Sequence, residues 1–324
     1  MTKLSWILGC IFLALVISWP MHLSWLSEPP PWQLEQYRLV ELEDICLKLV
    51  QDSSMYTEGW DSLAQPIFWR KTFRQPPDSI VVNIAKTREI VEVIGWREWH
   101  GWSDKTKKHY EDSIRTVYKV GKKEKVFFTT GRSHFYRFKE MMRVIDKGVG
   151  VFAEERVDPW YAQAILLVES PGKKRFSTEG AYGSFQLMAG VAKDMGLVVN
   201  DSIDEREDFA KSAQGAARLI DRICLPKARA LCEKYKLRFR ENDLWFRLLV
   251  MHIYHAGIGN VRRVVKRIKP KEGGQAFITQ MWQTTSRRFG NSSQNYSQII
   301  LACMMELDAI VQTHGLVCPV DASP

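Results

Sequence analysis

A single glutamate is a candidate acid–base group because of the residues that precede it. Glu169 follows residues 160–168, which are almost wholly apolar, and a Pro-Gly pair ends the segment soon afterwards. This pattern predicts a buried helix that begins at Asp158 and Pro159 and ends at Glu169. Poor hydration and the negative end of the helix dipole both raise the pKa of such a carboxyl group, as a general acid near neutral pH requires. The ordinary alternative is a carboxylate that reaches solvent at a helix end.

Three later segments contain further groups of the kinds that bind ligands. Residues 177–188 form a turn of small residues, whose two glycines three positions apart allow close approach of the backbone to a ligand. Within this turn Gln186 offers both a hydrogen-bond donor and an acceptor. Residues 253–261 are a second turn of aromatic residues and glycine between predicted helices, and Tyr296 lies where the last predicted helix opens.

Taken in this order, the four segments resemble the lytic transglycosylases of the soluble-transglycosylase (SLT) type, family 1, which have a goose-lysozyme-like catalytic domain. The family pattern begins E-S, continues S-x-x-G-A-x-G-x-x-Q-x-M and A-Y-N-A-G-x-G-x-V, and ends with a tyrosine motif. The matching residues are Glu169, Ser170, Ser177, Gly180, Ala181, Gly183, Gln186, Met188, Tyr254, Ala256, Gly257, Gly259, Val261 and Tyr296. The resemblance extends over residues 148–311, about half of the chain.

The resemblance implies a peptidoglycan lytic transglycosylase that cleaves the β-1,4 bond between MurNAc and GlcNAc and leaves a 1,6-anhydroMurNAc end. It implies that Glu169 is the single catalytic residue, first as acid and then as base, and that Ser177 and Tyr296 bind the N-acetyl group or orient Glu169. The substrate-binding residues that it implies are Ser177, Gln186, Met188, Tyr254, His255 and Tyr296. The expected binding partner is the glycan strands of peptidoglycan. Neither a metal or cofactor nor binding of nucleic acid is expected.

The sequence departs from the family pattern at the edges of these motifs. The segment between Glu169 and Ser177 is one residue shorter than usual and has Pro-Gly in place of an aromatic residue. His255 stands where Asn is usual, and Ile253 where Ala is usual. His255 can still donate and accept hydrogen bonds, but a histidine also titrates near neutral pH. These differences concern the substrate contacts and leave the class unchanged.

Two other functions fit parts of the same pattern. A hydrolytic lysozyme of the same fold would need a second carboxylate to activate water, for which Glu155 and Glu179 are the nearest candidates in the sequence. Glu179 falls at a variable position of the pattern and is expected on a surface loop. A non-catalytic wall-binding or envelope assembly protein could keep the fold, but it would not need Glu169, Ser177 and Tyr296 together.

The N-terminus predicts export and a membrane anchor. Residues 4–26 are apolar except for a few interruptions, among them Pro20 and His22, and are long enough to span a bilayer core of about 30 Å. No small-x-small cleavage site follows them. We therefore expect a single-pass inner-membrane protein whose catalytic domain lies in the periplasm. A cleaved signal peptide or lipidation at Cys10 are the alternatives.

Composition and cysteine usage fit an exported globular chain. Of the 324 residues, 45% are apolar and 26% are charged, which excludes wholesale disorder. The 46 basic and 37 acidic side chains give a net charge of +9, which suits an anionic partner. The cysteines beyond the apolar segment are Cys46, Cys224, Cys232, Cys303 and Cys318. In an oxidising compartment a bridge from Cys224 to Cys232 or from Cys303 to Cys318 is open, as are buried free thiols.

The residues between anchor and catalytic domain predict a small mixed region. Apolar residues recur with a helical period over residues 33–51, within a stretch rich in carboxylates. Residues 79–85 and 89–94 are rich in β-branched side chains and predict a hairpin. Trp96, Trp99 and Trp102 follow at every third position, as in a packed helical face or, alternatively, a ridge that contacts sugar or lipid.

Basic residues predominate over residues 105–147, which would suit anionic lipid headgroups or an anionic wall polymer. Partner proteins of the envelope would bind through the N-terminal region as a whole, residues 28–147. We expect a mainly α-helical protein in which a small α+β N-terminal region and a single transmembrane helix precede a lysozyme-like helical catalytic domain. The expected segments are 1–27 for the anchor, 28–147 for the N-terminal region, 148–315 for the catalytic domain and 316–324 for the tail.

Overall fold

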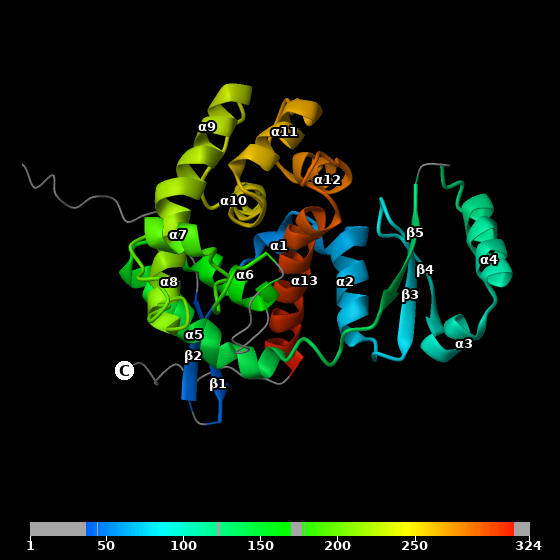
Figure 1. Ribbon diagram of the computed structural model, residues 1–324, viewed down its shortest axis with the longest axis horizontal. Helices are drawn as coiled ribbons and strands as arrows, with labels where there is room; N and C mark the ends of the chain where they lie inside the picture. Colours follow the sequence, from blue (N-terminus) through cyan, green and yellow to red (C-terminus); the bar gives the residue numbers. More distant parts are fainter. Residues whose placement is uncertain (1–36, 44, 122–123, 170–176, 178, 314–324) are drawn as a thin grey trace, which may run out of the picture.

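The computed structural model describes residues 37–43, 45–121, 124–169, 177 and 179–313, and their fold is mainly helical (Figure 1). The strands are β1 (Tyr37–Leu42), β2 (Ile45–Val50), β3 (Ser79–Ile84), β4 (Ile90–Gly95) and β5 (Val126–Thr130). The helices before residue 170 are α1 (Ser54–Thr57), η2 (Trp60–Ser62), α2 (Ala64–Arg74), α3 (Trp96–Gly101), α4 (Asp104–Val117), α5 (Phe138–Glu154) and α6 (Pro159–Glu169). Those after it are α7 (Ala189–Asp194), α8 (Phe209–Leu219), η3 (Ile220–Cys224), α9 (Leu225–Tyr235), α10 (Leu244–Ala256), α11 (Ile258–Ile268), α12 (Gln275–Gln283) and α13 (Asn291–Thr313).

The expected fold class requires one correction, which concerns the transmembrane helix. The segment to which the sequence assigned it, residues 4–26, lies outside the described residues. None of the helices that the structure describes is long and apolar enough to cross a bilayer. The longest of these, α13, mixes polar residues with apolar ones along its length. A transmembrane helix is therefore not part of the fold as described.

A β-hairpin replaces the helix expected over residues 33–51. Strands β1 and β2 pair antiparallel, with Leu42 opposite Ile45, and Glu43 at the end of β1 has φ +51°. Val40, Leu47 and Leu49 are buried, which gives this segment the alternation of a strand with one covered face. The expectation was wrong because a short amphipathic segment can satisfy the helical period and the strand period together.

Most of the buried apolar side chains of the described residues belong to one hydrophobic core, which we call the core of the main body. It includes side chains from Val40 near the N-terminal end to Val311 near the C-terminal end. Helix α6 lies inside it, because every residue from Pro159 to Leu167 is buried. Helix α5 crosses the boundary that the sequence placed between residues 147 and 148 and packs against α6. The N-terminal hairpin and α2 thus share their core with the catalytic helices.

A buried ion-pair cluster joins three parts of the main body. Arg247 on α10 has no exposed surface, and its guanidinium binds Asp158 at 2.7 Å and Asp52 at 3.4 Å. Asp158 also accepts the backbone N–H of Trp160 at 2.9 Å, which confirms it as the N-cap of α6. The cluster therefore connects the segment after β2 with the start of α6 and with the middle of α10.

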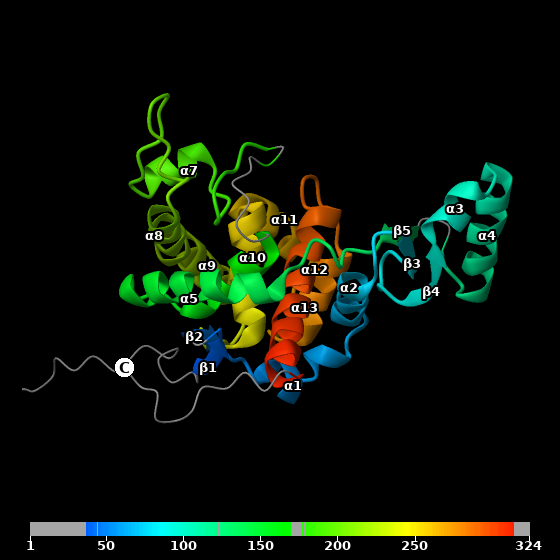
Figure 2. The ribbon, with the colours of Figure 1, turned by 90° about the horizontal axis from the view of Figure 1, so that it is seen from below.

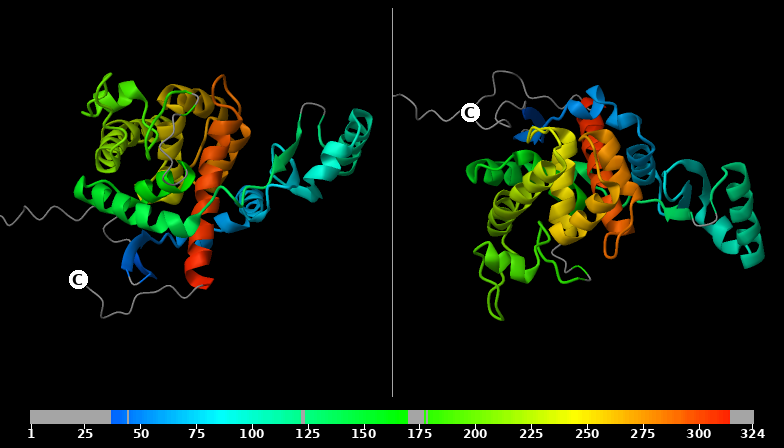
Figure 3. Two further views of the ribbon diagram at one scale, coloured as in Figure 1. Left: turned by 60° about the horizontal axis from the view of Figure 1, so that its bottom comes forward. Right: turned by 90° about the horizontal axis from the view of Figure 1, so that it is seen from above.

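The remaining residues form a small module, which we define as residues 77–131. Its sheet has the order β4-β3-β5 with antiparallel pairing, which confirms the predicted hairpin of β3 and β4. The module lies to one side of the main body in all views (Figures 2 and 3). Strand β3 contributes to both parts: its Ile80 and Val82 enter the module core, whereas Val81 enters the main-body core.

Helices α3 and α4 cover the module with aromatic side chains. Trp99 stacks on Phe128 with ring centroids 3.9 Å apart, and both pack against the module core together with Trp102. Trp96 is 42% exposed and stacks on His100 instead. Two of the three regularly spaced tryptophans thus form the packed face that the sequence suggested.

The described cysteines differ from both bridges that the sequence left open. Cys224, Cys232 and Cys303 are free and buried. Cys46 forms a disulfide. The buried free thiols that the sequence allowed are therefore the outcome for three of the six cysteines.

Candidate active site

Glu169 is the last residue of α6, where the sequence placed it, and its side chain is half-buried. The buried helix places the carboxyl group at the edge of the main-body core, where it is only partly exposed to water. Burial raises the pKa of Glu169 from its ordinary value of 4.5 to about 7. Near neutral pH the group can therefore hold a proton and release it, which is the property expected of a general acid that later acts as a base.

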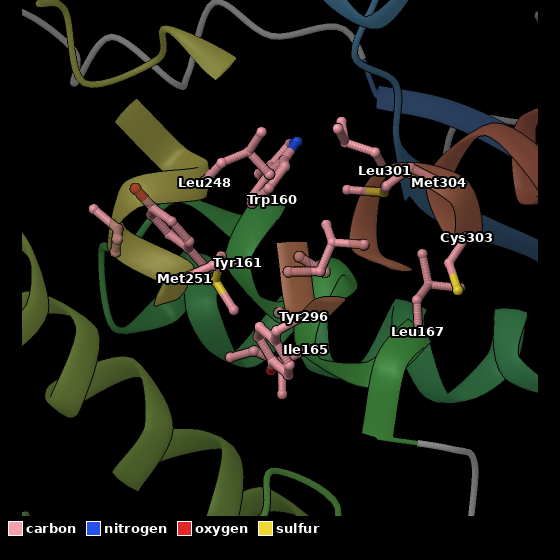
Figure 4. Close-up of a cluster of buried hydrophobic side chains, with 14 of the residues drawn as sticks. Trp160, Tyr161, Ile165, Leu167, Leu248, Met251, Tyr296, Leu301, Cys303 and Met304 are labelled. Carbon is pink, nitrogen blue, oxygen red and sulfur yellow. The ribbon is translucent and has the colours of Figure 1, made fainter. Parts of the chain in front are cut away.

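Tyr296 reaches Glu169 from the second turn of α13. Its ring is buried beside Ile165, which lies one helical turn before Glu169 (Figure 4). The hydroxyl meets no described partner at ordinary hydrogen-bond geometry, but it lies near enough to the carboxyl group to lower the pKa of Glu169. Two influences on the pKa of Glu169 therefore act in opposite directions: the phenol favours the carboxylate form, and the apolar surroundings favour the protonated form.

Tyr254 approaches the same carboxyl group from the end of α10. Its hydroxyl donates a hydrogen bond of 2.6 Å to the backbone carbonyl of Phe185. Burial raises the pKa of Tyr254, and the negative charge of Glu169 raises it further. The hydrogen bond from Tyr254 thus joins the loop that contains Phe185 to the end of α10, near the end of α6.

The loop of residues 177–188 is held in a tight shape by backbone geometry. Gly183 has φ +81°, and a Cβ atom on it would lie 2.0 Å from the carbonyl oxygen of Arg206, so that only glycine fits there. Tyr182 and Leu187 exchange two backbone hydrogen bonds of 3.1 Å. Between them Gln186 adopts φ +49°, a left-handed conformation that is uncommon for a residue with a side chain. The loop thus presents a fixed surface beside Glu169.

The other side chains predicted from the loop lie on that surface with different exposure. The Ser177 hydroxyl oxygen accepts the N–H of Ala181 at 2.9 Å, and its own hydrogen is left to donate. The Gln186 amide donates to the carbonyl of Gly183 at 2.8 Å. Met188 is 44% exposed and can contact a ligand directly. Ser177 and Gln186 therefore support the loop as well as facing outward.

His255 packs against Tyr296 instead of pointing away from it. The two rings are stacked with centroids 4.2 Å apart and planes 15° apart. Burial lowers the pKa of His255 to about 4. A neutral imidazole is therefore the form that supports the Tyr296 ring at neutral pH.

A buried polar chain fixes α13 to α10 next to this stack. The Trp282 indole donates to the Ser297 hydroxyl oxygen at 2.7 Å, and that hydroxyl contacts His252 Nε2 at 2.8 Å. The Ser297 hydroxyl donates to His252 Nε2 or accepts from it, according to the tautomer of the ring. Burial lowers the pKa of His252 to about 3, so this ring is neutral. The residue that follows Tyr296 is thereby held by the main body.

Two residues of the site were missed by the sequence analysis. Tyr136, in the loop before α5, is buried against Phe73 with ring centroids 4.0 Å apart. Burial raises the pKa of Tyr136, and the charge of Glu169 is among the further causes. Arg206 is buried, pairs with Asp204 at 2.6 Å and donates to the carbonyl of Leu187 at 3.0 Å. Both lie outside the motifs, and their sequence surroundings, one rich in aromatic residues and one rich in carboxylates, gave no sign of burial.

Comparison with protein families assigns this arrangement to a known domain. Residues 152–277 match the family model described as Transglycosylase SLT domain. The matched range contains Glu169, the loop of residues 177–188 and Tyr254, and it ends before Tyr296. The chain therefore contains an SLT transglycosylase domain, which indicates a lytic transglycosylase that acts on peptidoglycan, as the resemblance implied. A comparison with curated proteins found no match.

Proposed function

We propose that the enzyme cleaves the β-1,4 bond between MurNAc and GlcNAc and closes a 1,6-anhydroMurNAc ring, with Glu169 as the catalytic residue. The observation that carries this proposal is a half-buried carboxyl group whose pKa lies at about 7. Among the described residues, no second carboxylate contributes to that pKa. A single group that both gives and takes a proton suits a reaction in which no water is activated.

The reaction can be written with one proton donor and one proton acceptor. Glu169 donates its proton to the glycosidic oxygen as the bond to C1 of MurNAc breaks. The N-acetyl oxygen of the same sugar stabilises the positive charge that develops at C1. The Glu169 carboxylate then removes the proton of the C6 hydroxyl, and O6 bonds to C1. The intramolecular nucleophile is already close to C1, which lowers the entropic cost of ring closure.

The surrounding residues take the roles that their positions support. Tyr296 faces the carboxyl group and would donate its hydroxyl hydrogen to the N-acetyl oxygen or to Glu169 as charge develops. His255 supports the Tyr296 ring by stacking. Ser177, Gln186, Met188 and Tyr254 would line the sugar cleft, with Met188 the most exposed of them.

A hydrolytic muramidase is the alternative, and the two carboxylates suggested for it are poorly placed. The Glu155 carboxylate is bound by the guanidinium of Arg218 at 3.1 Å, which stabilises its charge without making it a base for water. Glu179 is exposed in the loop. Retaining and inverting hydrolases both place their two carboxyl groups on either side of one bond, and neither residue contributes to the pKa of Glu169.

Analysis of the released muropeptides by mass spectrometry tests the proposal. The wild-type protein is expected to release products with anhydro ends from purified sacculi. Glu169→Gln keeps the shape of the side chain but cannot donate a proton, so the rate should fall by about 10²–10⁴-fold while circular dichroism stays unchanged. Glu179→Gln is the matched control and should retain the wild-type rate. Reducing ends in the product, or cleavage by Glu169→Gln at the wild-type rate, would contradict the proposal.

We also propose that the enzyme works on the periplasmic side of the inner membrane, where its substrate lies. The disulfide at Cys46 supports this location, because disulfides persist in oxidising compartments. Proteins of the envelope remain proposed partners, and the module is the part of the N-terminal region that extends away from the active site toward solvent (Figure 3). Fractionation of cells followed by detection of the protein tests the location.

A further inference from the structure

The turn between β3 and β4 delivers an arginine from the module into the main body. Arg88 has φ +64°, a conformation that few residues other than glycine adopt. Its side chain is only 4% exposed, although the turn itself joins two strands of the module. A backbone conformation of this kind persists where surrounding contacts compensate for it, and Arg88 has two sets of such contacts.

The first set consists of aromatic rings. The guanidinium carbon lies 5.1 Å from the ring centroid of Phe68, 5.6 Å from that of Trp69 and 5.2 Å from that of Phe127. No carboxylate pairs with Arg88 in the part of the chain that the structure describes. Burial lowers the pKa of Arg88 to about 10, so the group stays charged at neutral pH. The rings thus hold a cation that has no anionic partner there.

The second set consists of two asparagine side chains at the start of α13. Nη2 of Arg88 donates to Oδ1 of Asn291 at 2.9 Å and to Oδ1 of Asn295 at 2.6 Å. These asparagines are one helical turn apart. A cation at the N-terminal end of a helix is disfavoured by the helix dipole, so electrostatic stabilisation of the helix does not explain the contact. The contact instead fixes geometry, because the planar guanidinium of Arg88 holds two successive turns at the start of α13.

Tyr296 lies immediately after Asn295, one of the residues that Arg88 holds. The next residue, Ser297, is held from the other side by Trp282 and His252 of the main body. We propose that Arg88 is a positioning residue for the reaction: it fixes the turn of α13 that carries Tyr296, so that the phenol faces the Glu169 carboxyl group. The proposal rests on the function proposed above, and it gives the module a role in catalysis.

The proposal predicts an effect on the pH profile that a purely structural contact would not have. Three titratable side chains interact electrostatically with Glu169. The charge of Glu169 raises the pKa of Tyr136 and of Tyr254, and Tyr296 lowers the pKa of the Glu169 carboxyl group. If Tyr296 turns away, the pKa of Glu169 rises. Because the acid form starts the reaction, the alkaline limb of kcat/KM against pH then moves upward.

The experiment compares folded variants of the full chain on purified sacculi. Arg88→Met removes the donor, and Arg88→Lys keeps the charge but is one bond shorter and lacks the planar guanidinium that directs two hydrogens at the asparagines. Both are expected to lower kcat by about tenfold or more and to move the alkaline limb upward by about half a unit to one unit. Tyr296→Phe should give the same shift, and the double variant Arg88→Met with Tyr296→Phe should shift no further.

Lys107→Met is the matched control, because Lys107 also lies over an aromatic ring, that of Trp99 at 5.4 Å, but remains within the module. It should keep the wild-type profile. If Arg88→Met does not fold, Asn295→Ala breaks the same contact from the other side and should give the same shift. An alkaline limb at the wild-type pH in either folded variant overturns the proposal, as does failure of both to fold. Failure of the proposed function would appear separately, as cleavage by Glu169→Gln.

Discussion

The main body and the module differ in what their interiors contain. The main body buries charged and polar side chains within a large apolar core, as at Arg247 and its two aspartates. The core of the module consists of five aliphatic side chains, covered by half-buried aromatic rings, and Asn83 and Arg88 are among the few polar side chains that the module buries. Its ion pairs, such as Lys108 with Asp112, lie at the surface, where such pairs add little stability. The stability of the main body therefore depends on a few buried polar contacts as well as on its apolar core, whereas that of the module depends mainly on the burial of apolar surface.

The largest expected effect follows from breaking the buried cluster. Arg247→Met leaves Asp158 and Asp52 buried without their partner, which should lower the free energy of unfolding of the main body by about 3–5 kcal/mol. Urea denaturation followed by tryptophan fluorescence measures this change. Arg240→Met is the control, since Arg240 pairs with Asp243 but is 82% exposed, and should change stability by less than about 1 kcal/mol. Equal effects of the two variants would contradict the comparison.

A change in the module core should be nearly as large but local. Ile80→Ala removes a buried side chain of β3 and should cost about 2–4 kcal/mol through lost burial and the cavity that remains. Amide hydrogen exchange should become faster in the module while α6 and α10 keep their protection. Val93→Ala, at a position 37% exposed, is the control and should be almost silent. Equal loss of protection in α6 would mean that the two parts unfold as one unit.

The pH dependence of stability should also distinguish the two parts. In the folded main body the pKa of Glu169 is about 7, above the ordinary value of 4.5. Protonation of Glu169 therefore favours the folded state over the unfolded state. This contribution to the free energy of unfolding is complete below about pH 4.5 and is lost as the pH rises through 7. The difference between these two pKa values corresponds to about 3 kcal/mol. Relative to wild type, Glu169→Gln should therefore gain about that much stability at about pH 8 and little at about pH 4. Exchange rates in the module, corrected for the intrinsic effect of pH, should not follow this difference.

The smallest expected effect concerns the exposed end of the module. Trp96 stacks on His100 but contributes to neither core. Trp96→Ala should therefore change the free energy of unfolding by less than about 1 kcal/mol, whereas Trp99→Ala, which removes a ring packed on Phe128, should cost more. Thermal melts of the two variants measure this order. The reverse order would show that the exposed stack belongs to the module core.

The sequence predicted the features that local patterns determine. The buried helix that ends at Glu169 follows from a continuous apolar run with an N-cap, and the hairpin of β3 and β4 follows from two β-branched runs. The motif order indicated the SLT class correctly. The hairpin at residues 37–50 was mistaken for a helix because its apolar spacing fits both periods, and the covering partner that decides between them, Gln163 bonded to Val50 at 2.8 and 2.9 Å, is far away in the chain.

Long-range contacts explain what could not be predicted at the site. Arg88 and Arg206 read as surface cations in the sequence, because nothing near them in the chain indicates the aromatic rings or carbonyl groups that surround them. Tyr136 lies near Glu169 only because α5 and α6 pack side by side. The motifs therefore identified the group that reacts, while the residues that hold its surroundings depend on packing between distant segments.

The free thiols in the core set a condition on how the protein is made. Burial raises the pKa of Cys224 and Cys232 to about 12 and that of Cys303 well above its ordinary value, so the reactive thiolate forms are scarce in the folded protein. Thiol–disulfide exchange with the Cys46 bond then becomes very slow. In the unfolded chain all six cysteines are equally open to oxidants. Correct pairing therefore depends on the helical core closing before oxidation is complete, and oxidative refolding from denaturant should yield scrambled disulfides unless reductant is present until the core has formed.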